Sequence, residues 1–187
     1  MSIEQEINRL QDLMPASGRI YCKIRSKPQQ TEIITTVFPL PWQSRNRLIY
    51  INFDLWRKLS IPQRDLLFLR NVAFSLGVKW FKFNIYQGIF FTALGALTLE
   101  ITNQDIVGIV LSGSLLTMTG NHIWKQNRSI EKELEADEGA IKIAIRRGYS
   151  PEEAKKHLRE AIESLSTIES HGSLNFTELL RVQNLMK

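Results

Sequence analysis

The chain has 187 residues, of which 43% are hydrophobic and 23% are charged, so its composition is that of a folded protein and excludes wholesale disorder. Its one cysteine and three histidines exclude a disulfide-stapled secreted module, a cysteine-rich zinc module and a histidine-rich metal site. The formal net charge is +5. Residues 1–84 carry 13 Lys and Arg against 6 Asp and Glu, a charge of +7, whereas residues 125–187 carry 11 of each. The basic excess therefore lies in the N-terminal part.

The N-terminal part, residues 1–82, combines helical and extended patterns. Apolar residues at helical spacing predict an amphipathic helix over 3–13. β-Branched and aromatic residues predict strands over 19–24, 32–38 and 48–53. A short helix is expected at 55–59, and Ser60 and Pro62 favour the start of a longer helix that reaches about residue 76. We expect an α+β fold, mostly α overall, in which a small N-terminal antiparallel sheet packs on helices.

Two runs without any charged residue follow, at 83–99 and 106–124, and the polar residues 100–105 separate them. A helix of about 20 residues spans the hydrocarbon core of a membrane, so residues 83–124 are predicted to form a transmembrane hairpin. Basic flanks and an acidic turn favour both termini in the cytoplasm. The N-terminus lacks a basic-then-apolar pattern, so no cleavable signal is expected. A helical hairpin buried in a soluble core is the alternative.

The C-terminal part, residues 125–187, is polar and helical. Helices are predicted over 129–147, 150–170 and 175–186. Ser150, Pro151 and Glu153 form a strong helix start, with an N-cap, a first-turn proline and a capping-box glutamate. The chain is thus expected to consist of a cytoplasmic basic part (1–82), a transmembrane hairpin (83–124) and a cytoplasmic helical part (125–187).

Residues 48–76 are expected to form a strand and a helix before the hairpin, and residues 128–149 to form an acidic helix after it, with the segment Glu133-Leu134-Glu135-Ala136-Asp137. This order of elements and this acidic segment resemble integral-membrane zinc metalloproteases of the HtpX type, over roughly half of the chain. In that family a helix with His-Glu-x-x-His precedes two membrane spans, and a later helix supplies the third zinc ligand. The resemblance implies a related scaffold here.

The counterpart of the zinc-binding motif is degenerate in this chain. Arg70 and Phe74 stand where the two histidines are expected, and Asn71 stands where the glutamate is expected. Neither a guanidinium nor a phenyl ring is a zinc ligand, which leaves Glu133, with Asp137 as its neighbour, as the one candidate. We therefore expect no catalytic residue, no metal and no cofactor. Arg70 is free either to pair with Glu133 in place of the metal or to face solvent or lipid headgroups.

Five further segments are distinctive, and they lie along nearly the whole chain: Leu13-Met14-Pro15-Ala16-Ser17-Gly18-Arg19, Phe38-Pro39-Leu40-Pro41-Trp42, Ile51-Asn52-Phe53-Asp54-Leu55-Trp56-Arg57, Pro62-Gln63-Arg64-Asp65 and Phe176-Thr177-Glu178-Leu179. Through these segments the chain also resembles a family of cyanobacterial membrane proteins of unknown function. This resemblance implies a plasma or thylakoid membrane location and no established activity.

These patterns favour a non-catalytic, membrane-anchored binding or assembly factor built on a pseudo-metalloprotease scaffold. Its expected partners are membrane lipids and a membrane protein or peptide, and no nucleic-acid motif is present. The strand at 48–53 is expected to offer an open edge to an extended partner. The candidate partner-binding residues are Trp42, Tyr50, Phe53 and Trp56.

Two alternatives remain open at this point. One is a membrane hydrolase with an unrecognised site, for example one that uses Glu133, Asp137 and His122. The other is a lipid-interacting structural protein that uses the basic N-terminal part.

Overall fold

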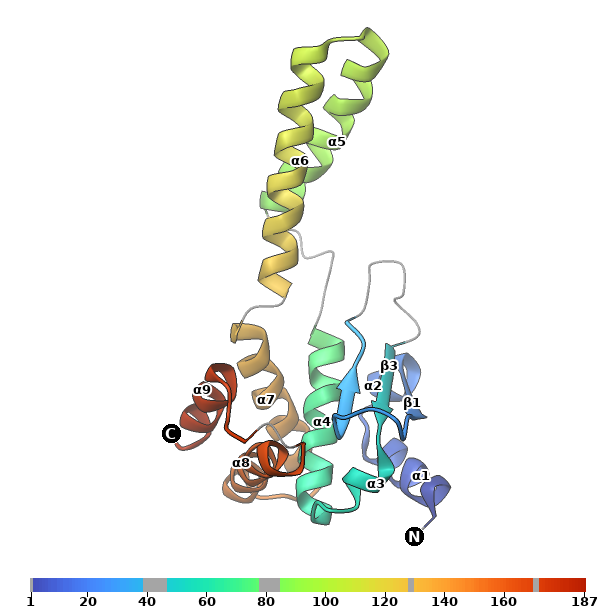
Figure 1. Cartoon of the computed structure of the whole chain (residues 1–187), viewed down its shortest axis with the longest axis vertical. Helices are drawn as coiled ribbons and strands as arrows, with labels where there is room; N and C mark the ends of the chain where they lie inside the picture. The colour runs from blue at the N-terminus through green and yellow to red at the C-terminus, as the bar shows by residue number, and fades with distance from the viewer. Residues whose placement is uncertain (1, 39–46, 78–84, 128–129, 170–171) are drawn as a thin grey trace. The chain divides into compact units, whose positions relative to one another are not determined.

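The computed structural model describes residues 2–38, 47–77, 85–127, 130–169 and 172–187 (Figure 1). The chain forms two compact units: residues 1–78 together with 130–187, and residues 79–129. The segments that flank the hairpin in sequence therefore share one unit, which we call the core unit, and the hairpin forms the other.

The core unit begins with two helices and a three-stranded sheet. Helix α1 (Ile3–Leu13) starts at a capping box between Ser2 and Gln5, and α2 (Ala16–Tyr21) follows it directly. The strands are β1 (Cys22–Ser26), β2 (Ile34–Thr36) and β3 (Arg47–Ile51). Residues 19–21, which were expected to be extended, belong to α2, so the first strand starts later than predicted.

The sheet is mixed, and this corrects the expected antiparallel sheet. Its strand order is β1-β3-β2, with β3 parallel to β1 and antiparallel to β2. The order differs from the chain order because β3 inserts between the first two strands. Consequently β3 has a hydrogen-bonded neighbour on each side, and the expected open edge at 48–53 is absent.

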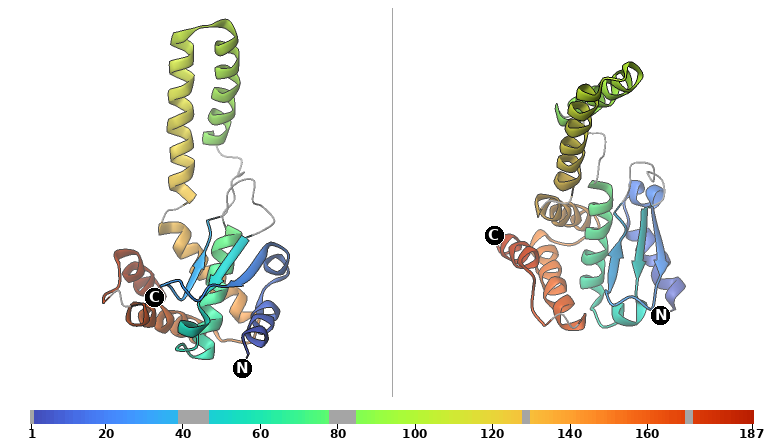
Figure 2. Two further views of the ribbon diagram at one scale, coloured as in Figure 1. Left: turned by 45° about the vertical axis from the view of Figure 1, so that its right-hand side comes forward. Right: turned by 45° about the horizontal axis from the view of Figure 1, so that its top comes forward.

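Helix α4 (Ile61–Gly77) is the centre of the core unit. A short helix, α3 (Phe53–Trp56), leads into it after β3. Figures 1 and 2 show α4 between the sheet and α7 (Ile130–Ile145). The helix meets the sheet through an apolar cluster that includes Ile49, Ile51, Phe68 and Val72. A second cluster joins its opposite side to the C-terminal helices, so α4 carries buried apolar side chains on both sides.

The C-terminal helices complete this second cluster. They are α7, α8 (Pro151–Ile168) and α9 (Phe176–Leu185). The predicted capping box at Ser150 and Glu153 is confirmed, because each side chain accepts a hydrogen bond from the other residue's backbone N–H. Leu158, Ile162 and Ala140 are fully buried against α4 residues Leu66 and Leu69.

The second unit consists of α5 (Ile85–Asn103) and α6 (Ile106–Asn127), which pack against each other along their length. The predicted pair of helices is therefore present. Within the described residues, however, no helix combines the length and apolarity needed to cross a membrane, so the expected transmembrane hairpin is not supported.

Candidate functional site

The site begins with a close approach of α4 and α7. Gly139 on α7 faces Ala73 on α4, and a Cβ atom at position 139 would lie only 2.9 Å from the Ala73 Cβ atom. A side chain larger than hydrogen would force the helices apart. The glycine therefore allows side chains on the preceding turns of both helices to meet.

Arg70 forms an ion pair with Glu133 at this crossing. Its Nε atom also lies 3.7 Å from Oδ1 of Asp137, which is almost completely buried. The predicted pairing of Arg70 with Glu133 is therefore present in the structure. The alternative, in which Arg70 faces only solvent or headgroups, is wrong. An ion pair joins the two helices at this position.

Arg181, on α9, adds a fourth member that the sequence reading missed. Its Nε and Nη2 atoms donate hydrogen bonds to the two carboxylate oxygens of Asp137, at 2.8 and 2.7 Å. Both side chains are more than 90% buried. A signal was available in the sequence, because Arg181 adjoins Val182 and lies one helical turn before Leu185 on the apolar side of α9. We refer to Glu133, Arg70, Asp137 and Arg181 as the ion-pair cluster.

The cluster sets the electrostatics of Arg70. Burial and the neighbouring Arg181 guanidinium lower the pKa of Arg70 to about 9, although Asp137 and Glu178 act in the opposite direction. The guanidinium still carries its charge at neutral pH. Two carboxylates and two guanidinium groups therefore balance one another within the cluster, as burial of charge requires.

Asn71 and Phe74, the other two degenerate-site positions, have structural contacts. The Asn71 amide donates to the backbone oxygen of Leu67 at 2.8 Å, and its oxygen accepts a hydrogen bond from Thr36 on β2, also at 2.8 Å. The Phe74 ring lies 5.5 Å from the Arg70 guanidinium, within the range of a cation–π contact. Both amide ends of Asn71 are thus occupied, and it links α4 to the sheet.

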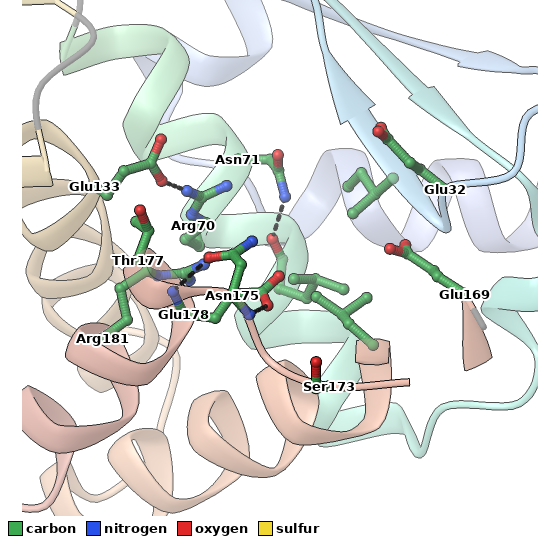
Figure 3. Close-up of a pocket in the computed structure, with 13 residues that line it drawn as sticks. Glu32, Arg70, Asn71, Glu133, Glu169, Ser173, Asn175, Thr177, Glu178 and Arg181 are labelled. Atoms are coloured by element: carbon green, nitrogen blue, oxygen red, sulfur yellow. Dashed lines mark hydrogen bonds and ion pairs between the residues drawn. The ribbon is translucent and has the colours of Figure 1, made fainter. Parts of the chain in front are cut away.

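A pocket of about 660 Å³ opens beside the ion-pair cluster. In Figure 3, Glu32 and Glu169 lie on one side of the pocket and Arg70, Glu133 and Arg181 on the other. Its lining is mostly polar, with three aliphatic side chains. The lining residues are Glu32, Ile34, Leu67, Arg70, Asn71, Glu133, Leu165, Glu169, Ser173, Asn175, Thr177, Glu178 and Arg181.

Of the residues predicted to bind a partner, those that the structure describes are not gathered at an exposed surface. Trp42 lies outside the described residues. Phe53 and Trp56 are buried in the core, and the Trp56 indole donates a 3.0 Å hydrogen bond to Glu6. Tyr50 is half-buried on the central strand. Because β3 is flanked on both sides and two of the aromatic rings are internal, direct partner contact through Phe53 or Trp56 is corrected to core packing.

The histidines do not form a metal site in the described part of the chain. The His122 ring belongs to the hairpin and lies 4.1 Å, between centroids, from Tyr86. On α8, His157 Nδ1 lies 3.1 Å from a Glu160 carboxylate oxygen, and His171 falls outside the described residues. Among the described residues, no group of three His, Cys, Asp or Glu side chains is arranged to hold a metal ion.

Comparison with known proteins assigns the chain to a family. Residues 8–149 match the family described as protein of unknown function DUF3318, which is about three-quarters of the sequence. The chain belongs to the DUF3318 family. This match covers α1 to α7, including Arg70, Glu133 and Asp137, whereas Arg181 lies beyond it.

A curated relative of this DUF3318 chain is the thylakoid membrane protein slr1949 of the cyanobacterium Synechocystis sp.. It is 27% identical over 164 residues, which cover 86% of this chain and 76% of the relative. These findings confirm the resemblance to a cyanobacterial family of unknown function. No solved structure matches the chain, and none of the comparisons supports the resemblance to HtpX-type metalloproteases.

Proposed function

We propose that this chain is a membrane-associated, non-catalytic binding protein, whose hairpin places its apolar surface in the lipid phase. The observation that carries the proposal is the surface of α5 and α6. Twelve large apolar side chains of the described hairpin helices are exposed, and exposed apolar surface of this extent is typical of a membrane or protein contact. They are Tyr86, Ile89, Phe91, Leu94, Leu99, Ile101, Ile106, Val107, Val110, Leu111, Leu115 and Met118.

The polar groups of the hairpin support the same placement. Each of the seven Ser and Thr hydroxyls in α5 and α6 donates a hydrogen bond to a backbone oxygen of its own helix three or four residues earlier. In an apolar phase water cannot satisfy such groups, so an internal acceptor removes a cost of several kcal/mol per group. The thylakoid membrane relative supports the proposal independently of these contacts.

The non-catalytic part of the proposal rests on the ion-pair cluster. Arg70 and Glu133 pair with each other, and both carboxylate oxygens of Asp137 accept hydrogen bonds from the Arg181 guanidinium. These groups are engaged in holding α4, α7 and α9 together, and Asn71 has no free amide end. We propose that a partner binds in the adjacent pocket. Metal analysis of the purified protein tests this part, and stoichiometric zinc would contradict it.

Flotation with vesicles tests the membrane part. The wild-type chain is expected to float with phosphatidylcholine vesicles, at low and at high salt alike, because burial of apolar area is not screened. The double variant Val110→Glu/Met118→Glu places two charges on the exposed apolar surface and is expected to stay with the soluble fraction.

Phe176→Glu/Met186→Glu is the matched control, because these side chains are similarly exposed at the two ends of α9 in the core unit. This control variant is expected to float as the wild type does. Equal loss of flotation in both double variants, or a wild-type chain that does not float, would contradict a specific role of the hairpin.

A further inference from the structure

The three-stranded sheet has one face against α4 and one face that is open. Side chains alternate along a strand, so Ile24, Ile49 and Ile51 point to α4 and are buried in the core. Their neighbours in sequence point the other way. None of these outward side chains is buried, and they are Lys23 and Arg25 on β1, Leu48 and Tyr50 on β3, and Thr35 on β2.

Cations gather on this open face. The register pairs Lys23 with Leu48 and Arg25 with Tyr50, so both basic side chains lie beside the central strand. Directly after β1, the Lys27 ammonium lies 5.3 Å from the centre of the Tyr50 ring. Lys23, Arg25 and Lys27 are exposed, and in the described part of the chain no ion pair engages any of them. We call Lys23, Arg25, Lys27, Leu48 and Tyr50 the basic face.

The charge of the surrounding sequence has the same sign. Residues 13–31 contain four Lys or Arg and no Asp or Glu. Two acidic residues adjoin the sheet at the far strand, β2: Glu32 accepts a hydrogen bond from the Thr35 hydroxyl, and Glu169 accepts one from the backbone N–H of Ile33. The positive charge of β1 and the turn after it is therefore not neutralised by a neighbouring carboxylate of the same segment.

We propose that the basic face docks on the anionic headgroup surface of a membrane. Charge complementarity supports this choice, because Lys and Arg near an anionic leaflet each add to binding. Tyr50 also suits the boundary between headgroups and water, where tyrosine is enriched. The inference rests on the proposed membrane association, but it uses residues of the core unit and none of the hairpin.

A fluorescent label on the open face tests the inference with the full chain. Val37 follows β2 and is exposed, so Val37→Cys accepts an environment-sensitive dye, whereas the native Cys22 is buried. After reconstitution, a blue shift is expected in vesicles that contain phosphatidylglycerol and not in pure phosphatidylcholine, and added NaCl should reverse it. The same emission in both lipids would overturn the proposal.

Charge variants decide whether the basic face itself is responsible. Lys23→Gln/Arg25→Gln/Lys27→Gln should abolish the blue shift, with unchanged thermal unfolding. The matched control is Lys142→Gln/Arg146→Gln/Lys156→Gln, which removes three exposed cations from α7, from the residue that follows it and from α8, and should retain the shift. Equal loss in both triple variants would overturn the proposal, since it would indicate attraction by net charge alone.

The two proposals fail in different measurements. Wild-type protein that does not float with phosphatidylcholine contradicts the hairpin proposal, but leaves the label experiment readable because anionic vesicles can still bind the basic face.

Single-stranded polyuridylate is a further probe, since flat sheets with aromatic and basic residues also bind RNA. A blue shift with polyuridylate and none with anionic vesicles would overturn the assignment to lipid.

Discussion

At the scale of single residues, two groups of charged side chains hold the core unit together. The ion-pair cluster joins α4, α7 and α9. The second group lies nearer the start of α4, where the Arg9 guanidinium on α1 donates to Glu6 and, at 2.6 Å, to Asp65 on α4. The Tyr149 hydroxyl donates a hydrogen bond to the same Asp65 at 2.8 Å. Burial of the hydroxyl and this hydrogen bond together raise the pKa of Tyr149 above its ordinary range. These contacts join segments far apart in sequence.

The first prediction concerns the pair between Arg70 and Glu133. Arg70→Glu or Glu133→Arg alone places two like charges together in a largely buried place, and each should destabilise the protein. In urea unfolding, the charge-swapped double variant should be about 1–3 kcal/mol more stable than the sum of the two single effects predicts. Glu138 and Lys142, an exposed pair on α7, are the control and should show coupling below about 0.5 kcal/mol. Additive effects at positions 70 and 133 would contradict the pairing.

The second prediction concerns pH. Burial acts to raise the pKa of Glu6, but hydrogen bonds from Arg9 and from the Trp56 indole outweigh it and hold the pKa below its ordinary value. A carboxyl group with a depressed pKa stabilises the fold above its unfolded pKa, and this stabilisation is lost as the pH falls through the folded pKa. Glu6→Gln should therefore cost about 1–3 kcal/mol at pH 7, because Arg9 and Trp56 lose a charged acceptor.

The difference between Glu6→Gln and wild type should shrink as the pH falls below the unfolded pKa and through the depressed folded pKa, because the wild-type carboxyl then becomes protonated. Thermal unfolding between pH 3 and pH 7 measures it. Glu4→Gln, at an exposed position of the same helix, is the control and should change little. A difference of constant size at all pH values would show that the carboxylate charge is not the cause.

At the scale of elements, the contact of α4 with α7 is set by glycine. Gly139 and Ala73 leave no room for another carbon atom, so Gly139→Ala should destabilise the protein by about 1–3 kcal/mol despite the better helix propensity of alanine. Gly77→Ala is the control, because nothing lies within 4 Å of its added Cβ atom. It should be neutral or stabilising by up to about 1 kcal/mol.

A second substitution tests the cause of the Gly139→Ala effect. Ala73→Gly removes the atom that the new Cβ would meet, so the double variant Ala73→Gly/Gly139→Ala should be more stable than the sum of the single effects. Chemical denaturation of the four proteins gives this coupling. Additivity within error would contradict steric conflict at the crossing.

At the scale of the whole molecule, the core unit is discontinuous in sequence. Its second apolar cluster needs Leu66 and Leu69 from before the hairpin and Ala140, Leu158 and Ile162 from after it. We therefore predict that replacement of residues 79–129 by a flexible Gly/Ser linker of about 12 residues leaves the core unit folded. A cooperative thermal transition and unchanged near-ultraviolet circular dichroism would show this.

The corresponding truncation should have the opposite result. A chain that ends at residue 129 lacks α7, α8 and α9, and α4 would expose one of its two apolar sides. It should lose the cooperative transition, because burial of that side supplies a large share of the favourable free energy. A cooperative transition in the truncated chain would contradict the discontinuous core.

The sequence by itself determined the features that depend on neighbours in the chain. Helical spacing, prolines and capping residues located α1, α4, α8 and α9 to within a few residues, and the charge-free runs located the hairpin helices. Local signals suffice there, because a helix forms its backbone hydrogen bonds four residues apart. The pairing of Arg70 with Glu133 was also accessible, although only through a resemblance that the comparisons do not support.

Only the tertiary structure decided which residues far apart in sequence meet. It placed β3 in the middle of a mixed sheet, buried Phe53 and Trp56, and brought Arg181 to Asp137. Strand order depends on pairings between segments that have no fixed spacing in the sequence. The side-chain repeats of a strand (two residues) and of a helix (3.6 residues) do not encode these pairings. The basic face has the same origin, because alternation predicts which side chains share a face but the covering helix decides which face stays open.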